Sequence, residues 1–489
     1  MSFQFVDNTV IDKRARKLIR SHVMKGKNVG KVREPRRKDL VRIDRTTNPP
    51  YSYTKTHTAD IQHDSILVKL TRQIGNDPTL LSCPVRPNPQ SLAQVQQLFL
   101  FLLDIAQPKE FCRPTNVLGW MWFDLVFRDE AYFHCTMALT SAFAAFLTQD
   151  SYDSPVALYH MSQTFRLLAK KLSSDEALSD STIAVVTSTS IYDRLYGNSR
   201  KAMVHLGGVY RMVELRGGIK ALAERNFLVA EKTFRTDFEL ALYSGSTPKY
   251  SAEDVPHHLV VINRNNCLGP PEPEIAISAL YQSAGAGLRG VVTDALNLTH
   301  LLREQENRIR KLEPAAFQST IIYFGYRLIE IDLFHQDFTA DNSFDKLIHL
   351  ALIGFMNTFW LGIGWQIVKF PLMMERFRQA AQYSLSPCLN GQKTLLWALF
   401  IGRMSLATTA DDSWMIPKIR MLADQLRLRS WPEVSGILQE FPWVNVVHQG
   451  PGQKLWDIAI GKSQPLKVVT PASEGGIGSS IALCKRTIL

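Results

Sequence analysis

Apolar side chains recur every three to four residues over most of the chain between residues 91 and 448, which is the spacing of one helix face. Runs that alternate apolar and polar residues, as a half-buried strand would, are nearly absent. Ser154-Pro155 and Gly217-Gly218 are typical of a helix start and a helix end. The pattern therefore predicts an all-α fold, with one large domain of packed antiparallel helices over residues 91–448.

The periodic runs predict individual helices over 95–102, 137–147, 156–168, 181–196, 201–215, 292–311, 318–334, 344–368, 372–384, 392–407 and 416–427. Asp180 is the expected N-cap of the fourth helix. The uncharged stretch 347–368 is long enough for a membrane span, but its polar residues and aromatic side chains lie within it. We therefore expect a buried core helix there. Residues 243–274 predict an irregular segment across the surface.

The first fifty residues differ from the rest in charge. They hold fourteen Lys and Arg against five Asp and Glu, so nine of the eleven net positive charges lie there. Thr9 and Asp12 fit a capping pattern, and Ile11, Leu18 and Val23 fall on one side of a helix over 9–24. We predict a basic arm over 1–50 with one helix and a disordered segment, a linker over 51–90 and a flexible tail over 449–489.

A dense block of positive charge usually serves a polyanion, a nuclear import receptor or an anionic membrane. The candidates for contact with DNA phosphates or importin are Lys13, Arg14, Arg16, Lys17, Arg20, Lys25, Lys27, Lys31, Arg33, Arg36, Arg37 and Lys38. Two alternatives remain. The arm is only a solvated tail, or the helix over 9–24 anchors the chain at a membrane surface or targets it to an organelle. Asp7 and Asp12 count against a transit peptide.

Sequence motifs of catalysis are mostly missing. The chain has no phosphate-binding loop, no H-E-x-x-H and no G-x-S-x-G. Gly285, Gly287 and Gly290 spell G-x-G-x-x-G without the β-α-β context, so we expect a tight turn between helices. His205 lies on the apolar side of a helix, which favours a hydrogen-bonded core histidine. We expect no catalytic residue, no cofactor and no metal ligand.

The cysteines and the first residues indicate the compartment. No two cysteines are close enough to form a C-x-x-C pair, so we expect reduced thiols. The first residues lack the apolar run of a secretory signal, so we expect an intracellular protein. The six cysteines are Cys83, Cys112, Cys135, Cys267, Cys388 and Cys484.

The central helices resemble the fungal-specific transcription factor domain, the all-helical regulatory region found beside zinc binuclear cluster DNA-binding domains. The motif residues, to which we assign structural roles, are Ala202, His205, Leu206, Gly208, Met212, Arg216, Gly217 and Gly218. Gly208 would let two helices approach closely, and Gly217-Gly218 would end a helix. Further likeness lies in 159–168, 182–184, 396–402, 431–434 and 441–443, so that the resemblance spans roughly 91–448.

The resemblance implies transcription regulation in the nucleus without enzymatic activity, because the family offers no catalytic residues to carry over. The zinc cluster of that family needs six cysteines in two C-x-x-C-x6-C half-sites, which this chain lacks. The expected partners are DNA through the basic arm, with weak binding, importin, other regulatory proteins and a small effector; we do not expect a membrane. The alternatives are an enzyme with an unrecognised pocket in the helical domain, and a cytoplasmic location.

Overall fold

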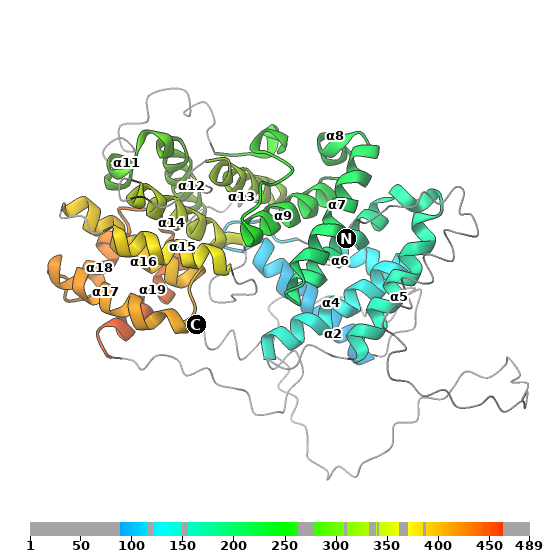
Figure 1. The fold of residues 1–489 in the computed structure, drawn as a ribbon, viewed down its shortest axis with the longest axis horizontal. Helices are drawn as coiled ribbons and strands as arrows, with labels where there is room; N and C mark the ends of the chain where they lie inside the picture. The colour runs from blue at the N-terminus through cyan, green and yellow to red at the C-terminus, as the bar shows by residue number, and fades with distance from the viewer. Residues whose placement is uncertain are drawn as a thin grey trace, which may run out of the picture. The chain divides into compact units, whose positions relative to one another are not determined.

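The computed structural model of the 489-residue chain describes residues 89–115, 121–148, 155–262, 278–307, 311–331, 339, 342–360, 370–384 and 388–462. These residues form helices and short 3₁₀ turns, and none of them belongs to a named strand (Figure 1). One isolated bridge pairs Cys112 with Leu312. The predicted all-α fold is therefore confirmed for this part of the chain. The predicted arm over 1–50 lies outside it.

The α-helices run in the order α2 (Pro89–Ala106), α3 (Met121–Arg128), α4 (Glu130–Thr148), α5 (Pro155–Leu172), α6 (Asp180–Leu195), α7 (Ser199–Leu215), α8 (Gly218–Arg225), α9 (Phe227–Ser244), α11 (Ala279–Ser283), α12 (Arg289–Asn307), α13 (Pro314–Ile329), α14 (Ser343–Trp360), α15 (Pro371–Tyr383), α16 (Leu389–Ser405), α17 (Asp412–Gln425), α18 (Trp431–Leu438) and α19 (Asn445–Ala459). The 3₁₀ turns are η2 (Asp175–Leu178), η3 (Ala252–Asp254), η4 (His257–Leu259), η6 (Ala286–Leu288) and η8 (Thr409–Asp411).

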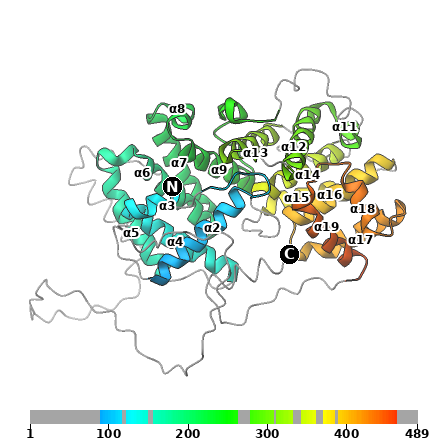
Figure 2. The same ribbon diagram turned by 180° about the vertical axis from the view of Figure 1, so that it is seen from behind.

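The helices pack in two groups, which we name the N-terminal lobe (α2–α9) and the C-terminal lobe (α11–α19). In the N-terminal lobe α4 packs against α5 and α6, and α6 packs against α7 and α9. In the C-terminal lobe α14 packs against α15 and α16. Helix α16 also contacts α17, α18 and α19. Helix α9 contacts both α13 and α15, so it joins the lobes (Figures 1 and 2).

Helix α6 is buried along most of its length although it is rich in Ser and Thr. Hydroxyl groups lose hydrogen bonds to water on burial, so each needs an acceptor in the protein. Thr187 donates to the carbonyl of Ile183 and Ser188 to that of Ala184, four residues earlier in the same helix. Ser190 instead donates to the carbonyl of Ala202 in α7, at 2.8 Å. These hydroxyls therefore satisfy their own donors and also join α6 to α7.

Several helix boundaries differ from the predicted ones for local reasons. Asp180 is not the N-cap of α6, because Ser179 takes that position and accepts a hydrogen bond from the Thr182 amide. The long helix predicted over 344–368 ends as α14 at Trp360, and 361–369 lie outside the described residues. In contrast, α5 begins at Pro155 as its Ser-Pro start predicts.

The helical part of the chain continues past residue 448, where we placed the start of the flexible tail. Helix α19 runs to Ala459 and buries Leu455 and Trp456. The Gly- and Ser-rich composition of 449–489 favoured a tail, but Gly452 has a packing role. A Cβ atom there would lie 2.8 Å from ring atoms of both Trp431 and Trp443. Burial of the helix face thus overrides the local preference.

Two other expectations concern α14 and the glycine-rich turn. Among the described residues no helix combines the length and the apolar character that a membrane crossing requires. Helix α14 is instead part of the core, with Phe355 and Met356 fully buried. Gly285 and Gly287 lie at the 3₁₀ turn η6 between α11 and α12, as predicted for a turn between helices. The Gly285 amide donates to the Asp345 carboxylate at 2.9 Å.

Gly402 allows a close approach of α16 to Phe377 of α15. A Cβ atom at Gly402 would lie 2.5 Å from Cζ of Phe377, a fully buried ring. We expect Gly402→Ala to lower the free energy of unfolding by about 1–3 kcal/mol through overpacking. Gly436→Ala in α18 is the matched control, since nothing lies within 4 Å of its added Cβ. Urea unfolding checks both; equal stability of the two variants would contradict the packing.

A buried histidine joins α19 to α14. His448 accepts a hydrogen bond from the Val444 amide at Nδ1 (2.8 Å), and its Nε2 lies 3.0 Å from the Thr358 hydroxyl. Thr358 donates to the Phe355 carbonyl, so its oxygen accepts from His448. Burial lowers the pKa of His448 to about 3. The imidazole is therefore neutral in the folded protein at physiological pH.

Acidification should destabilise the fold through this group. The unfolded chain binds a proton on His448 below about pH 6.5, and the folded protein does so only near pH 3. Its contribution to stability is therefore lost as pH falls from about 6.5 to about 3. We expect the free energy of unfolding to fall less steeply from pH 7 to pH 5 in His448→Gln than in the original chain. The exposed His258→Gln should keep the original slope.

Candidate functional site: the central helices

The twelve basic candidates of the arm, Lys13 to Lys38, lie outside the described residues, so the structure bears on the other group of candidates. These are the motif residues of α7 and of the turn that follows it. Ala202, Leu206 and Met212 are buried on the side of α7 that faces α6 and α9. Their apolar side chains thus fix α7 in the N-terminal lobe.

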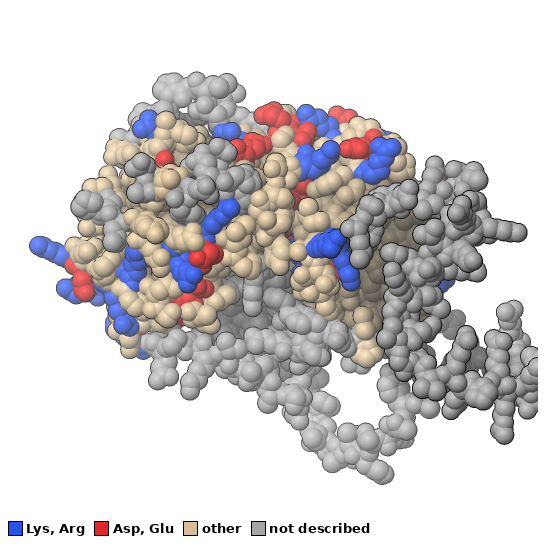
Figure 3. All heavy atoms as spheres, viewed as in Figure 1, with Lys and Arg blue, Asp and Glu red and all other residues tan. Residues whose placement is uncertain are grey.

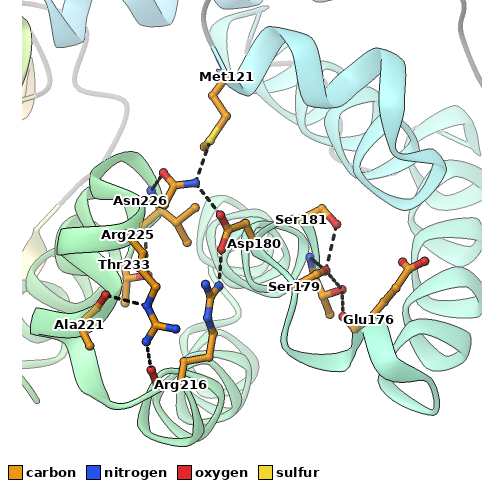
Figure 4. Close-up of polar contacts among 12 residues, drawn as sticks. Met121, Glu176, Ser179, Asp180, Ser181, Arg216, Ala221, Arg225, Asn226 and Thr233 are labelled. Carbon is orange, nitrogen blue, oxygen red and sulfur yellow. Dashed lines mark hydrogen bonds and ion pairs between the residues drawn. The ribbon is translucent and has the colours of Figure 1, made fainter.

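Helix α7 ends where its two glycines occur. Gly217 and Gly218 have φ angles of 94° and 91°, in the left-handed region that L-residues rarely adopt. Gly218 then begins α8 directly. Helices α7 and α8 are therefore separated by one tight turn, which brings Arg216 and Arg225 close together (Figure 4).

Arg216 takes part in a group of polar side chains at the end of α7, shown in Figure 4. Its guanidinium donates to Oδ1 of Asp180, and Nδ2 of Asn226 donates to Oδ2 of the same carboxylate at 2.6 Å. Arg225 donates to the Arg216 carbonyl and, at 3.1 Å, to the Ala221 carbonyl. The Asp180 carboxylate also lies in the first turn of α6, where the helix dipole favours a negative charge.

We name Asp180, Arg216, Arg225 and Asn226 the Asp180 group. The group joins three helix ends: the start of α6, the end of α7 and the junction of α8 with α9. The Arg216 side chain is only 15% exposed, so its charge is neutralised by Asp180 rather than offered to a ligand. The amide of Val229 also donates to Asn226, which is the N-cap of α9. We conclude that this part of the motif orients helices and has no catalytic geometry.

His205 is not the core histidine that the sequence predicts. Its side chain is 25% exposed, and Nε2 lies 3.2 Å from Oδ2 of Asp193 in α6. Its ring stacks on Phe165 of α5, with 5.9 Å between the ring centroids. Helical periodicity placed His205 on the apolar side of α7, but it lies at the edge of that side. It joins α7 to both α5 and α6 at the surface.

Gly208 is not required for helix packing, contrary to the expectation. A Cβ atom there would lie 3.9 Å from Cγ1 of Val186, an ordinary contact, and at Gly207 it would meet nothing within 4 Å. Both glycines are exposed. Small residues in an apolar run suggested a close approach, but the side chains of α6 leave room for a methyl group.

Ser188 and Lys232 form the pair of side chains that most resembles a catalytic pair among the described residues. The lysine Nζ lies 2.6 Å from the Ser188 hydroxyl and 4.5 Å from the centre of the Trp122 ring. Burial lowers the pKa of Lys232 to about 8. A Ser-Lys pair can act as nucleophile and base. However, Ser188 is 1% exposed and donates to the Ala184 carbonyl, so a substrate does not reach it.

A second buried group surrounds Asp237 of α9. Tyr326 and Tyr210 donate to its two oxygens, as do the amides of Lys249 and Tyr250 at 2.9 and 3.2 Å. Burial raises the pKa of Asp237, although these four donors favour the charged form. Because Tyr326 lies in α13, this cluster ties the two lobes together. Sequence reasoning missed it, since its members are up to 116 positions apart.

A cavity of about 660 Å³ lies beside α8, between the start of α9 and the segment from η3 to η4. Its rim is charged, and Nζ of Lys220 lies 3.7 Å from Oδ1 of Asp254. Its apolar lining is Ala223, Phe227, Val255, Pro256, Leu259 and Ala315. Across the described residues, no three His, Cys, Asp or Glu side chains form a group that could hold a metal ion. The volume of the cavity lies in the range of pockets that bind small organic molecules.

Replacement of the two exposed glycines should stabilise the fold. Gly207→Ala and Gly208→Ala should each raise the free energy of unfolding by about 0.5–1 kcal/mol, because alanine loses less backbone entropy in a helix. Gly217→Ala is the contrasting control, since its φ of 94° strains an L-residue. Thermal unfolding of the three variants separates these effects; destabilisation by Gly208→Ala would restore a packing role.

A comparison with known protein families supports the resemblance that the central helices show. Residues 105–240 match the model of the family described as the fungal specific transcription factor domain. No curated protein matches the chain, and no solved structure matches it. The matched segment runs from the end of α2 into α9 and is shorter than the 91–448 of the predicted resemblance. The resemblance is confirmed over this segment alone, because residues 105–240 match the fungal specific transcription factor domain.

Proposed function

We propose that the protein is a nuclear regulator of transcription that has no zinc cluster of its own. The observation that carries the proposal is the match of residues 105–240 to a transcription factor domain. That family consists of regulatory rather than catalytic domains. The polar groups around Asp180 and Asp237 support the same view, because they are occupied with joining helices.

The basic arm is the proposed element for nucleic-acid contact or nuclear import. Residues 1–50 carry a net charge of +9, whereas the other 439 residues carry +2. On the face in Figure 3, the Lys and Arg side chains of the described residues are scattered, and many of them lie beside Asp or Glu. Contacts to phosphates position a protein on DNA, whereas base contacts specify sequence. The arm thus contributes affinity, and a partner that reads bases contributes specificity.

The helical body is the proposed receiver of regulatory partners. Its cavity beside α8 is large enough for a small effector. A molecule bound there touches α8 and the start of α9, next to the Asp180 group. Occupation of the cavity would therefore act on the same helix junction that fixes α7.

Replacing Lys13, Arg16, Lys17, Arg20, Arg36, Arg37 and Lys38 with Gln tests the role of the arm. For each DNA phosphate that the arm no longer neutralises, the slope of log affinity against log salt should become shallower by about 0.9. We expect weaker binding to all duplex sequences alike and a loss of nuclear signal from the full-length protein. Binding is measured by fluorescence anisotropy on two unrelated duplexes, and localisation by fluorescence microscopy.

The matched control removes seven exposed cations of the body: Lys109, Arg128, Arg289, Arg378, Arg427, Arg429 and Lys462. The change in net charge is the same, so an effect of total charge alone would appear in both variants. We expect the control to keep the salt slope and the nuclear signal. An arm variant that stays nuclear and binds DNA like the original chain would refute the proposal.

A further inference from the structure

Large apolar side chains are exposed mainly on two helices. Fourteen large apolar side chains are exposed among the described residues, and eight of them lie on α5 and α7. Scattered single apolar residues are normal at a surface, but a concentration of this kind marks an interaction site. The eight are Val156, Leu158, Tyr159, Phe165, Leu172, Met203, Val204 and Leu215.

Part of this set forms a line along α5. Leu158, Phe165 and Leu172 are seven residues apart, so they lie on one side of the helix. Phe165, at the middle of the line, stacks on His205 of α7. The end of α5 and α7 both contact η2. The two helices thus meet at the contact of Phe165 with His205, and we name their exposed sides together the α5–α7 face.

Helix α7 contributes exposed apolar side chains and an exposed glycine to this face. Val204 is 67% exposed and Leu215 is 55% exposed, and Gly208 lies between them on the same side. Glycine within a helix costs about 0.5–1 kcal/mol relative to alanine. Neither Gly207 nor Gly208 is needed for packing inside the protein. Their effect is to leave the backbone of α7 open to close approach from outside.

Helices α5 and α7 also carry more basic than acidic residues. Helix α5 has three basic residues and no acid, and Glu214 is the one acid of α7. Glu214 lies within ion-pair distance of Arg211 and Lys249. Among the described residues no ion pair involves Lys170 or Lys201, and both are exposed. The exposed sides of α5 and α7 therefore combine apolar side chains with two cations that make no ion pair among the described residues, and the exposed acids Asp175 and Glu176 lie nearby on η2.

We propose that the α5–α7 face binds an amphipathic helix of a partner protein whose polar side is acidic. Apolar side chains of such a helix would contact Phe165 and Val204, and its acids would pair with Lys170 and Lys201. A second copy of this face, or the basic helix predicted over 9–24, would bring like charges together. The proposal deepens the proposed function by naming the partner class.

The probe is an 18-residue peptide with Leu at helical positions i, i+3, i+4 and i+7 and Glu on the other side. The same peptide with Lys in place of Glu is the charge control. The protein is the full chain with the seven arm cations replaced by Gln, because the arm would itself attract an acidic peptide. Since DNA binding and nuclear import by the arm are removed in this background, the result does not depend on the proposed role of the arm.

Binding of the labelled peptide is followed by fluorescence anisotropy. We expect the Glu peptide to bind at least about tenfold more tightly than the Lys peptide, and more weakly at high salt. Phe165→Glu, Lys201→Glu and Gly208→Leu should each weaken binding about tenfold or more. Val446→Glu and Tyr383→Glu are the controls, since these residues are 50% and 69% exposed but lie in α19 and α15. Circular dichroism checks that each variant is folded.

Three results would overturn the proposal. One is equal affinity for the Glu and Lys peptides, or affinity that Phe165→Glu and Lys201→Glu leave unchanged. Another is concentration-dependent dimerisation in sedimentation that Phe165→Glu abolishes, which would make the face an interface between two copies. The third is displacement of the Glu peptide by a synthetic peptide of residues 9–24 that binds the face more tightly, which would assign the face to the arm.

Discussion

The burial of helix α6 is the constraint on which the N-terminal lobe depends. Twelve of its sixteen residues are buried, and many of them carry hydroxyl groups. Backbone carbonyls accept from Thr187, Ser188 and Ser190, and the last of these bonds extends to α7. A polar helix can thus occupy the centre of a lobe without unsatisfied hydroxyl donors at these positions. Its start is then fixed by charge, through Asp180 and Arg216.

Helices that bury one face could be predicted from the sequence, because their apolar period is strong. Helix α7 is an example, since it ends at Leu215, two residues before Gly217. Contacts between distant segments could not be predicted in this way. The Tyr326 hydroxyl donates to Asp237, which lies 89 positions earlier in the sequence, and a local sequence pattern does not extend over such a separation. The predicted packing role of Gly208 was wrong for a related reason. A glycine in the sequence allows another helix to approach closely, but it does not show whether a helix lies on that side.

The candidate site shows the same division. The motif identified the segment that matches the transcription factor domain, but it did not distinguish inward from outward roles. Arg216 and Met212 serve the interior of the lobe, whereas His205 and Gly208 lie at its surface. The exposed line on α5 was hidden in the sequence, because Leu158 and Phe165 belong to the same apolar run as buried residues. Only the packed neighbours decide which side of a helix is covered.

The joining role of α9 has a consequence for the boundaries of the matched segment. That segment ends at residue 240, yet Phe238 packs so closely under α13 that a Cβ atom on Gly325 would lie 2.9 Å from its ring. A polypeptide cut at residue 240 would lose α13, expose Phe238 and remove a tyrosine hydroxyl from Asp237. The segment recognised by sequence is thus smaller than the set of helices that cover α9, which includes α13 and α15.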